Sequence, residues 1–291
     1  MPDSHAILDA ATDMGINFID TANQYGGALG VGATETILGE WLARDPARRS
    51  RIVLATKVHE PMSDDINDRG LSARHIQMAC EASLKRLQTD HIELYQFHHV
   101  DRTVQPEELW QAADRLIAEG KITYLGSSNF PGWKIAQTNE RARATGRLGL
   151  VCEQSLYNLI ERRAELEVIP ASIEYGLGVI AWSPLAGGAL AGMAEGAGRR
   201  EAATQQLSPQ RTAQLYRFAD LCADLGESSS AVVLAWVLSQ PGIAAVIAGP
   251  GSLQQLKSME RVPDLVLTDE VLAALDAIFP PCGPAPEAYA W

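Results

Sequence analysis

Four side chains suited to proton chemistry follow apolar runs at regular intervals along this chain. Asp20 and Tyr25 come after the first run, Lys57 ends the second, and His98 ends the third. A carboxylate, a phenol, an ammonium and an imidazole thus arrive in order, each after a strand-like segment. Strand ends of this kind are where α/β barrels place reacting groups. The pattern predicts a proton-handling site.

The phenol of Tyr25 is the predicted proton donor. An unperturbed phenol titrates near ~10, and the ammonium of Lys57 would favour the phenolate and so make Tyr25 a better donor. Asp20 would hold Lys57 by a charge-assisted hydrogen bond. His98 would hydrogen-bond an incoming carbonyl oxygen and orient it. Together these residues would protonate an oxygen while another group attacks its carbon.

Each of these residues also has a plainer interpretation. Asp20 could cap a helix, Lys57 could be solvated, and Tyr25 could pack at the rim of the barrel. His98 with His99 could form a pair whose hydrogen bonds are already satisfied, or part of a metal site. Adjacent histidines rarely face the same way on a strand, and no Cys or His-x-His pattern supports a metal. We therefore predict no metal ligands. The plain interpretations together require four coincidences in successive units, so we favour the catalytic one.

The elements that must position these residues alternate between strand-like and helix-like segments, which favours parallel βα units. The expected strands cover residues 16–20, 52–56, 92–97, 123–126, 150–153, 179–182 and 244–248. The expected helices cover residues 7–14, 34–43, 72–88, 107–119, 133–144, 164–175, 212–225, 230–239, 253–259 and 269–279. We predict an α/β fold with one domain over residues 1–291, a (β/α)8 TIM barrel whose first strand is missing from the chain.

Composition narrows the class of protein. The chain has 291 residues, 46% of them hydrophobic, and a net charge of −12. This charge argues against nucleic acid and anionic membranes as partners. The four cysteines lie far apart, so a disulfide framework is not expected. The chain opens without a signal-peptide pattern, and its longest apolar runs are too short to span a bilayer. We expect a soluble, cytoplasmic protein.

Polar and aromatic residues at the later strand ends suit a flat ligand. Ser128 and Asn129 end one strand, Gln154 follows the next, and Trp182 ends the one after. Hydroxyl and amide groups match the donors and acceptors of a carboxamide, and an indole could stack on a ring, which together describes nicotinamide. The Gly-rich turn at 247–256 could receive a phosphate. No G-x-G-x-x-G follows a strand, so a Rossmann domain is not supported.

Taken together, these motifs resemble the aldo-keto reductases along nearly the whole chain. The segments that carry the resemblance are Asp20-Thr-Ala-Asn-Gln-Tyr25-Gly, Thr56-Lys57-Val, Leu94-Tyr-Gln-Phe-His98, Gly126-Ser-Ser-Asn129 and Trp182-Ser-Pro-Leu185. The Trp-Ser-Pro-Leu form is most similar to bacterial members and to potassium-channel β-subunits. The resemblance implies a (β/α)8 barrel that binds NADPH across its C-terminal face and passes a hydride to a substrate carbonyl.

The resemblance also implies a role for each matching residue. Its catalytic tetrad would be Asp20, Tyr25, Lys57 and His98, with Tyr25 as the general acid. Its cofactor contacts would be Ser128, Asn129 and Gln154 at the carboxamide, Trp182 on the nicotinamide ring, Ser183 and Leu185 at the pyrophosphate, and Gly249, Ser252 and Gln255 near the adenosine.

The chain departs from the family pattern at two places. Family members begin with a hairpin and a first strand that carries a Gly-Thr-Met-like segment, and nothing here matches these. Many NADPH-using members also carry an arginine in the turn after the last strand. Gly251 and Gln255 stand at the matching positions, with only Lys257 nearby. The expectation of NADPH therefore comes from the family, and NADH is the alternative.

The leading functional prediction is an NAD(P)H-dependent reductase of a small-molecule carbonyl, namely an aldehyde, a ketone or a sugar-like compound. The alternatives are an NADPH-binding regulatory protein with little turnover, an inactive truncated member, and a Schiff-base aldolase that uses Lys57. A homo-oligomer is left open. The loops at 58–71 and 184–209 are expected on the C-terminal face, where they would set the choice of substrate.

Overall fold

The computed structural model describes residues 2–191 and 207–290. Within these residues, seven strands form one sheet in the order β1 to β7, the same order as in the chain. The strands are β1 (Phe18–Asp20), β2 (Val53–Val58), β3 (Ile92–Phe97), β4 (Ile122–Ser128), β5 (Leu150–Leu156), β6 (Gly178–Trp182) and β7 (Ile243–Val246). The prediction of seven parallel strands is confirmed, and the α/β fold is consistent with a (β/α)8 barrel that lacks a strand.

Helices alternate with these strands at nearly the predicted positions. They are α1 (Pro2–Asp13), α2 (Ala33–Ala43), α3 (Ala73–Leu87), α4 (Pro106–Ala118), α5 (Gly132–Arg143), α6 (Val168–Tyr175), α8 (Pro209–Leu225), α9 (Ser229–Ser239), α10 (Leu253–Lys257), α11 (Asp269–Ile278) and α12 (Glu287–Ala290). The sequence did not predict α12, whose four residues are too few for a periodic apolar pattern.

Local chemistry explains where the helices begin and how closely they pack. Ser72 caps α3 as predicted, because its hydroxyl accepts a hydrogen bond from the His75 backbone N–H at 3.2 Å. Gly39 allows α2 to approach the end of α3. A Cβ added at Gly39 would lie 2.1 Å from the backbone oxygen of Arg86. A larger side chain there would therefore force the two helices apart.

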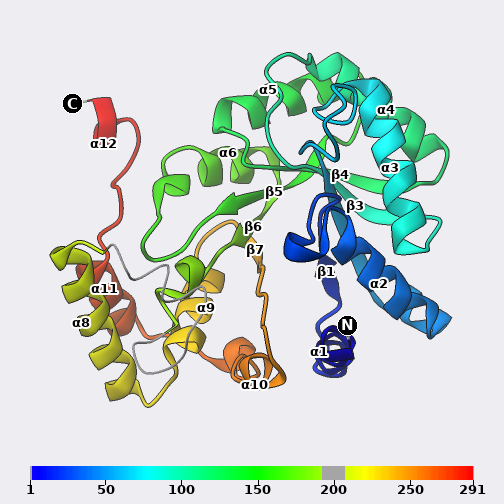
Figure 1. Cartoon of the computed structure of the whole chain (residues 1–291). Helices are drawn as coiled ribbons and strands as arrows, with labels where there is room; N and C mark the ends of the chain where they lie inside the picture. Colours follow the sequence, from blue (N-terminus) through cyan, green and yellow to red (C-terminus); the bar gives the residue numbers. More distant parts are fainter. Residues whose placement is uncertain (1, 192–206, 291) are drawn as a thin grey trace. The chain divides into compact units, whose positions relative to one another are not determined.

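The chain divides into two compact units. Unit 1 comprises Met1–Glu153 with Tyr175–Leu177, and unit 2 comprises the remaining residues. In unit 1, helices α1 to α4 each pack against the next helix in the chain (Figure 1). Large apolar side chains from these helices and from β2 to β4 fill its core, among them Trp41, Leu54, Ile76, Tyr95, Phe97 and Phe130.

Unit 2 has its own core around α8, α9 and α11. The rings of Tyr157 and Trp236 stack with their centroids 5.4 Å apart, and those of Phe218 and Phe279 meet edge to face at 5.9 Å. Arg162 is buried under this cluster, and its guanidinium lies 5.0 Å from the centroid of the Trp236 ring. Aromatic packing and the contact of the Arg162 guanidinium with the Trp236 ring therefore help to stabilise the core of this unit.

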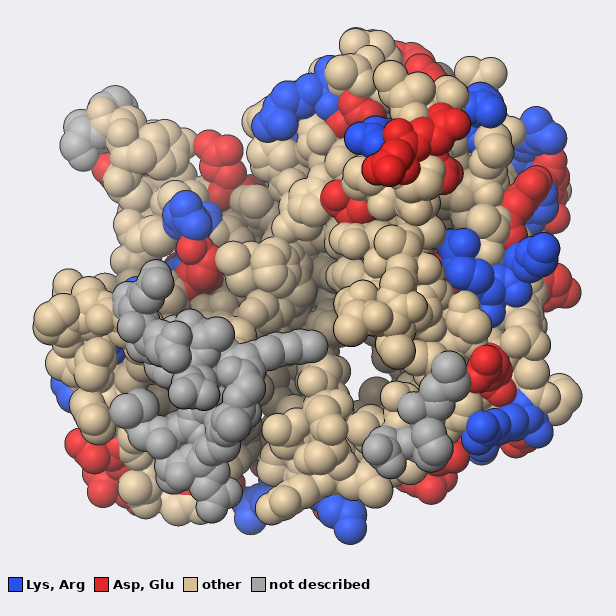
Figure 2. All heavy atoms as spheres, in the orientation of Figure 1, with Lys and Arg blue, Asp and Glu red and all other residues tan. Residues whose placement is uncertain are grey.

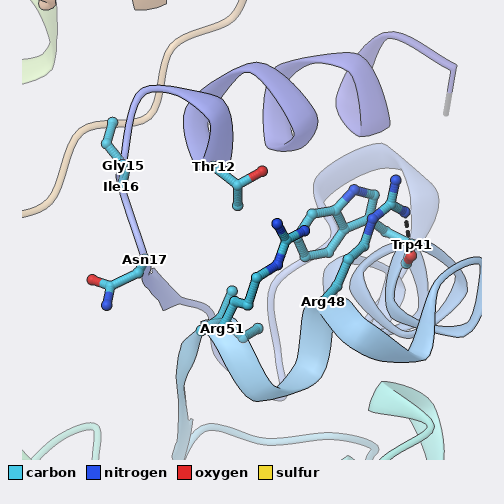
Figure 3. A pocket seen from close by; sticks show the side chains of 8 residues that line it. Thr12, Gly15, Ile16, Asn17, Trp41, Arg48 and Arg51 are labelled. Carbon is cyan, nitrogen blue, oxygen red and sulfur yellow. Dashed lines mark hydrogen bonds between the residues drawn. The ribbon is translucent and has the colours of Figure 1, made fainter.

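A cavity of about 230 Å³ lies in unit 1 at the amino ends of β1 and β2 (Figure 3). Arg48 crosses it, with its guanidinium 4.8 Å from the centroid of the Trp41 ring and 2.7 Å from the Trp41 backbone oxygen. Its lining residues are Thr12, Gly15, Ile16, Asn17, Trp41, Arg48, Arg51 and Ile52. Because the tetrad residues lie at the carboxyl ends of the strands, this cavity is not the place where they meet.

The visible surface carries charges of both signs. Lys and Arg side chains lie interspersed with Asp and Glu side chains on the face shown in Figure 2. No single helix among the described residues is both long and apolar enough to cross a membrane. Only α8 and α9 taken together, bent by 94° between them, have sufficient length and apolar composition.

Candidate active site

The four predicted tetrad residues come together at the carboxyl ends of β1, β2 and β3. Asp20 ends β1, Lys57 lies one residue before the end of β2, and His98 directly follows β3. Tyr25 lies in the loop after β1. This loop is tied to β2, because the Asn23 backbone N–H donates to the carbonyl oxygen of Lys57 at 3.1 Å. The pairing of parallel strands therefore fixes the relative positions of all four residues.

Lys57 and Asp20 form a buried ion pair. The side chain of Lys57 is 0% exposed and that of Asp20 is 5% exposed. The Lys57 ammonium donates to Asp20 and also to the carbonyl oxygen of Thr21 at 2.9 Å. Gln96 Nε2 donates to the other oxygen of Asp20 at 2.9 Å. The predicted contact between Asp20 and Lys57 is thus present, and it leaves Lys57 tightly held.

Tyr25 stands over this ion pair beside His98. The Tyr25 hydroxyl lies 3.4 Å from His98 Nε2, and the two rings meet edge to face with centroids 5.6 Å apart. Lys57 Nζ lies 5.1 Å from the centroid of the Tyr25 ring. Tyr25 is 36% exposed, whereas Lys57, His98 and the side chain of Asp20 are buried. The phenol is therefore the tetrad group that solvent can reach.

The pKa of Tyr25 is opposite to the sequence-based expectation. Burial first, and then the charges of Asp20 and Glu60, raise the pKa of Tyr25 to about 12. We had expected Lys57 to favour the phenolate. Burial and the negative charges of Asp20 and Glu60 outweigh the opposing effect expected from the Lys57 ammonium. Tyr25 consequently stays protonated at physiological pH, which is the state a proton donor requires.

His98 is held neutral. Burial, and then the charges of Lys57 and His99, lower the pKa of His98 from 6.5 to about 3. Its Nδ1 atom is buried and has no hydrogen-bond partner among the described residues. A neutral imidazole can donate a hydrogen bond from one nitrogen only. His98 can therefore orient an oxygen atom beside Tyr25 without carrying a positive charge.

This lowered pKa predicts a loss of stability in acid. Below pH 6.5 the unfolded chain protonates His98, whereas the folded chain does so only near pH 3. The free energy of unfolding should therefore fall as the pH decreases from 6.5 towards 3, with a slope from this group of at most about 1.4 kcal/mol per pH unit. His98→Asn should show a shallower fall in urea titrations at several pH values. His91→Asn, at an exposed histidine, is the control, and equal slopes for all three proteins would contradict the assignment.

Two of the predicted cofactor residues lie in unit 1, at the end of β4. Ser128 is its last residue, and Asn129 follows with a positive φ of 57°. Asn129 Nδ2 donates to the backbone oxygen of His98 and to Ser128 Oγ, both at 3.0 Å. Buried Glu153 steadies this strand end, because it accepts hydrogen bonds from Ser127 and from the Phe130 N–H. The hydroxyl and amide groups therefore lie directly beside the tetrad histidine.

The other predicted cofactor residues belong to unit 2. Gln154 is buried in β5, and Trp182 ends β6 half-buried. Ser183 follows with a φ of 52°, and Asn158 Nδ2 donates to its backbone oxygen at 2.9 Å. Leu185 packs against the core of this unit. The turn from Trp182 to Leu185 is thus fixed by backbone geometry and by packing.

The turn after β7 is closed by its own side chains. Gln255 Oε1 accepts a hydrogen bond from the Gly251 N–H at 2.7 Å, and Ser252 Oγ accepts one from the Gln255 N–H at 3.2 Å. Ser252 is the N-cap of α10. Gly249 precedes this turn, with open space around the position of an added Cβ. The predicted loop at 184–209 includes residues 192–206, which lie outside the described part of the chain.

Sequence reasoning missed two polar residues near the tetrad. Gln96 orients Asp20 through a hydrogen bond. It lies two residues before His98, and side chains two apart on a strand point to the same face, so this alternation could have predicted that Gln96 lies near the tetrad. Asn23 is fully buried, and neither polar atom of its side chain has a hydrogen-bond partner among the described residues. Asn23 lies between Asp20 and Tyr25 in the sequence, but an asparagine at this position does not by itself indicate a buried side chain or a role in the site.

Comparison with known proteins places the chain in a family. The model of the aldo/keto reductase family matches residues 1–279. An uncharacterised oxidoreductase of Bacillus subtilis, YrpG, is 49% identical over 98% of this chain and 90% of its own length. A probable voltage-gated potassium channel β-subunit of Oryza sativa is 30% identical over 95% of this chain and 87% of its own. Norsolorinic acid reductase B of Aspergillus parasiticus is 32% identical over 93% and 73%, respectively.

The family model and the relatives together define the class of protein. The chain belongs to the aldo/keto reductase family, whose members are oxidoreductases.

Proposed function

We propose that this protein reduces the carbonyl group of a small aldehyde, ketone or sugar-like compound to an alcohol, with Tyr25 as the general acid. One observation carries the proposal: a protonated, partly exposed phenol lies 3.4 Å from the Nε2 atom of a neutral His98, above the buried pair of Lys57 and Asp20. A substrate oxygen placed beside both residues would receive a hydrogen bond from His98 and a proton from Tyr25.

The residues present fit a reduced nicotinamide cofactor. Ser128 and Asn129 offer a hydroxyl and an amide beside His98, which is the donor and acceptor set that a carboxamide requires. We assign Gln154 and Trp182 to the same ligand, and the turns of Ser183–Leu185 and Gly249–Gln255 to its phosphates and adenosine. The chemistry that NADPH, or NADH, supplies when bound is a hydride for the carbonyl carbon. Tyr25 supplies the matching proton to the oxygen, so the product is the neutral alcohol.

Two alternatives are weighed against this proposal. The relatives named as potassium channel β-subunits favour a protein that binds the cofactor and regulates a partner with little turnover. A Schiff-base aldolase is disfavoured, because Lys57 is buried and its ammonium is engaged by Asp20 and Thr21. A lysine held in this way is a positioned charge and not a free nucleophile.

The deciding experiment combines binding and turnover. Fluorescence titration with NADPH and with NADH measures the affinity for each cofactor, and the loss of NADPH absorbance over a panel of aldehydes and ketones measures reduction. We expect saturable binding together with steady-state reduction of at least one carbonyl. Tight binding with no turnover of any carbonyl would favour the regulatory alternative. Failure to bind either nucleotide would refute the proposal.

A further inference from the structure

Three side chains form a second cluster beside the tetrad, entirely within unit 1. His59 and Glu60 directly follow β2, and His99 comes two residues after the end of β3. Glu60 Oε1 lies 3.1 Å from His59 Nδ1 and 2.5 Å from His99 Nδ1. One donor atom from each of the three side chains lies within 4.8 Å of the other two. Two imidazole nitrogens and one carboxylate oxygen therefore converge on one region.

These three atoms are the donor types that first-row transition metals prefer. Imidazole nitrogen and carboxylate oxygen bind zinc at about 2.0–2.2 Å, and a tetrahedral ion places neighbouring donors about 3.3 Å apart. The distance of 3.1 Å from Glu60 Oε1 to His59 Nδ1 is near this value, and the distance of 2.5 Å to His99 Nδ1 would have to lengthen by less than 1 Å. Magnesium and calcium prefer sets made of oxygen atoms alone, so two imidazoles argue against them. Three protein donors also leave a fourth position open.

An ion can reach this cluster without any opening of the core. His59 and Glu60 are half-buried, and the side chain of His99 is 47% exposed. The Glu60 carboxylate contacts both imidazoles, so the three donors already converge. A bound ion would replace the two hydrogen bonds to Glu60 with stronger bonds to the same atoms. Little rearrangement of the backbone is therefore required.

We propose that His59, Glu60 and His99 bind one divalent transition-metal ion, with zinc as the ion that this donor set suits. From the sequence alone we predicted no metal ligands, because adjacent histidines rarely face the same way on a strand and no Cys or His-x-His pattern is present. The ring of His99 stacks on that of His98 with centroids 5.2 Å apart. A bound ion would therefore lie one imidazole away from the tetrad, and we expect it to slow carbonyl reduction; this consequence rests on the proposed function.

The test is a calorimetric titration of the metal-free protein with zinc sulfate. We expect one ion per chain in the wild-type protein. Glu60→Gln and His99→Asn should each weaken binding by at least as much as the roughly 10–100-fold loss seen when an outer-shell partner is removed. Cobalt(II) provides a second measurement, because tetrahedral coordination by these donors gives visible absorption bands that both variants should lose. Circular dichroism shows that the variants are folded.

Two control variants separate this site from other zinc-binding groups. His91→Asn removes a histidine that also lies beside two carboxylates. Its Nδ1 faces Asp90 and its Nε2 faces Glu93, so one ion bound to a single nitrogen of this ring cannot reach both carboxylates. Cys282→Ser removes an exposed thiol. Both controls should bind zinc as the wild type does.

Two results would overturn the metal site: no stoichiometric zinc binding by the wild type, or unchanged binding by the Glu60 and His99 variants. The inhibition of reduction by zinc is measured separately. If no carbonyl is reduced, the binding titration still decides whether the metal site exists, so failure of the proposed function and failure of the metal site are distinguishable.

Discussion

Tyr25→Phe should lower kcat for carbonyl reduction by about 10²–10⁴-fold, the usual contribution of a general acid, and leave cofactor affinity unchanged. The substitution removes only the hydroxyl that lies beside His98 Nε2. The phenyl ring retains its place over Lys57, so the ion pair beneath it keeps its environment. Steady-state kinetics gives kcat, and fluorescence titration gives the affinity for NADPH.

A matched control shows whether the effect belongs to the site. Tyr124 is an exposed tyrosine on β4 in the same unit, and Tyr124→Phe also removes a single hydroxyl. This control should reduce substrate at the wild-type rate. Retained activity in Tyr25→Phe would refute the role of Tyr25 as the acid. Since the pKa of Tyr25 is raised to about 12, titration of this phenol should not lower the activity of the wild-type protein near neutral pH. A loss of activity near neutral pH that Tyr25→Phe abolishes would contradict the raised pKa.

Lys57→Met should destabilise the fold by about 3–5 kcal/mol, because it leaves a buried charge without its partner. The Asp20 side chain is nearly inaccessible to solvent, and the neutral amide of Gln96 that donates to it does not cancel the charge of its carboxylate. Urea denaturation followed by circular dichroism measures the free energy of unfolding. The exposed pair of Arg115 and Glu119 provides the comparison, and Arg115→Met should change the free energy of unfolding far less than Lys57→Met does, because solvent screens an exposed ion pair.

A double variant separates the structural role of this ion pair from its chemical role. Asp20→Asn combined with Lys57→Met leaves no buried charge, so it should recover much of the stability lost in Lys57→Met. It should not recover carbonyl reduction, because the ammonium beneath Tyr25 is still missing. A double variant no more stable than Lys57→Met would contradict the electrostatic explanation. A double variant with wild-type turnover would remove Lys57 from the mechanism.

Much of the fold could be predicted because it depends on local patterns. Apolar runs of strand length ended at Asp20 and His98, and the N-cap at Ser72 follows from its hydroxyl and its place before a periodic helix. The tetrad could be predicted for the same reason, since parallel strands bring their carboxyl ends to one edge. Four residues at successive ends therefore had to lie near one another.

The remaining features depend on contacts that no local pattern encodes. The pKa of Tyr25 reflects how deeply its ring is buried and how the charges of Asp20 and Glu60 lie around it, and both are set by three-dimensional packing. The convergence of Glu60 with His99 depends on the path of the segment after β2, which carries no periodicity. The hydrogen bond from the Gly251 N–H to the side chain of Gln255 likewise could not be predicted from the sequence, because it depends on the conformation of the turn.

All four tetrad residues lie between positions 20 and 98, within unit 1, whereas most of the proposed cofactor residues lie in unit 2. The residues of acid–base chemistry and most of the proposed cofactor-binding residues are thus encoded by separate stretches of the gene. A single crossover after Glu153 would join the proton-handling half of this protein to the recognition half of a relative. Recombination between family members at this point would therefore exchange most of the proposed cofactor contacts and keep the acid–base residues and the loop at 58–71 together.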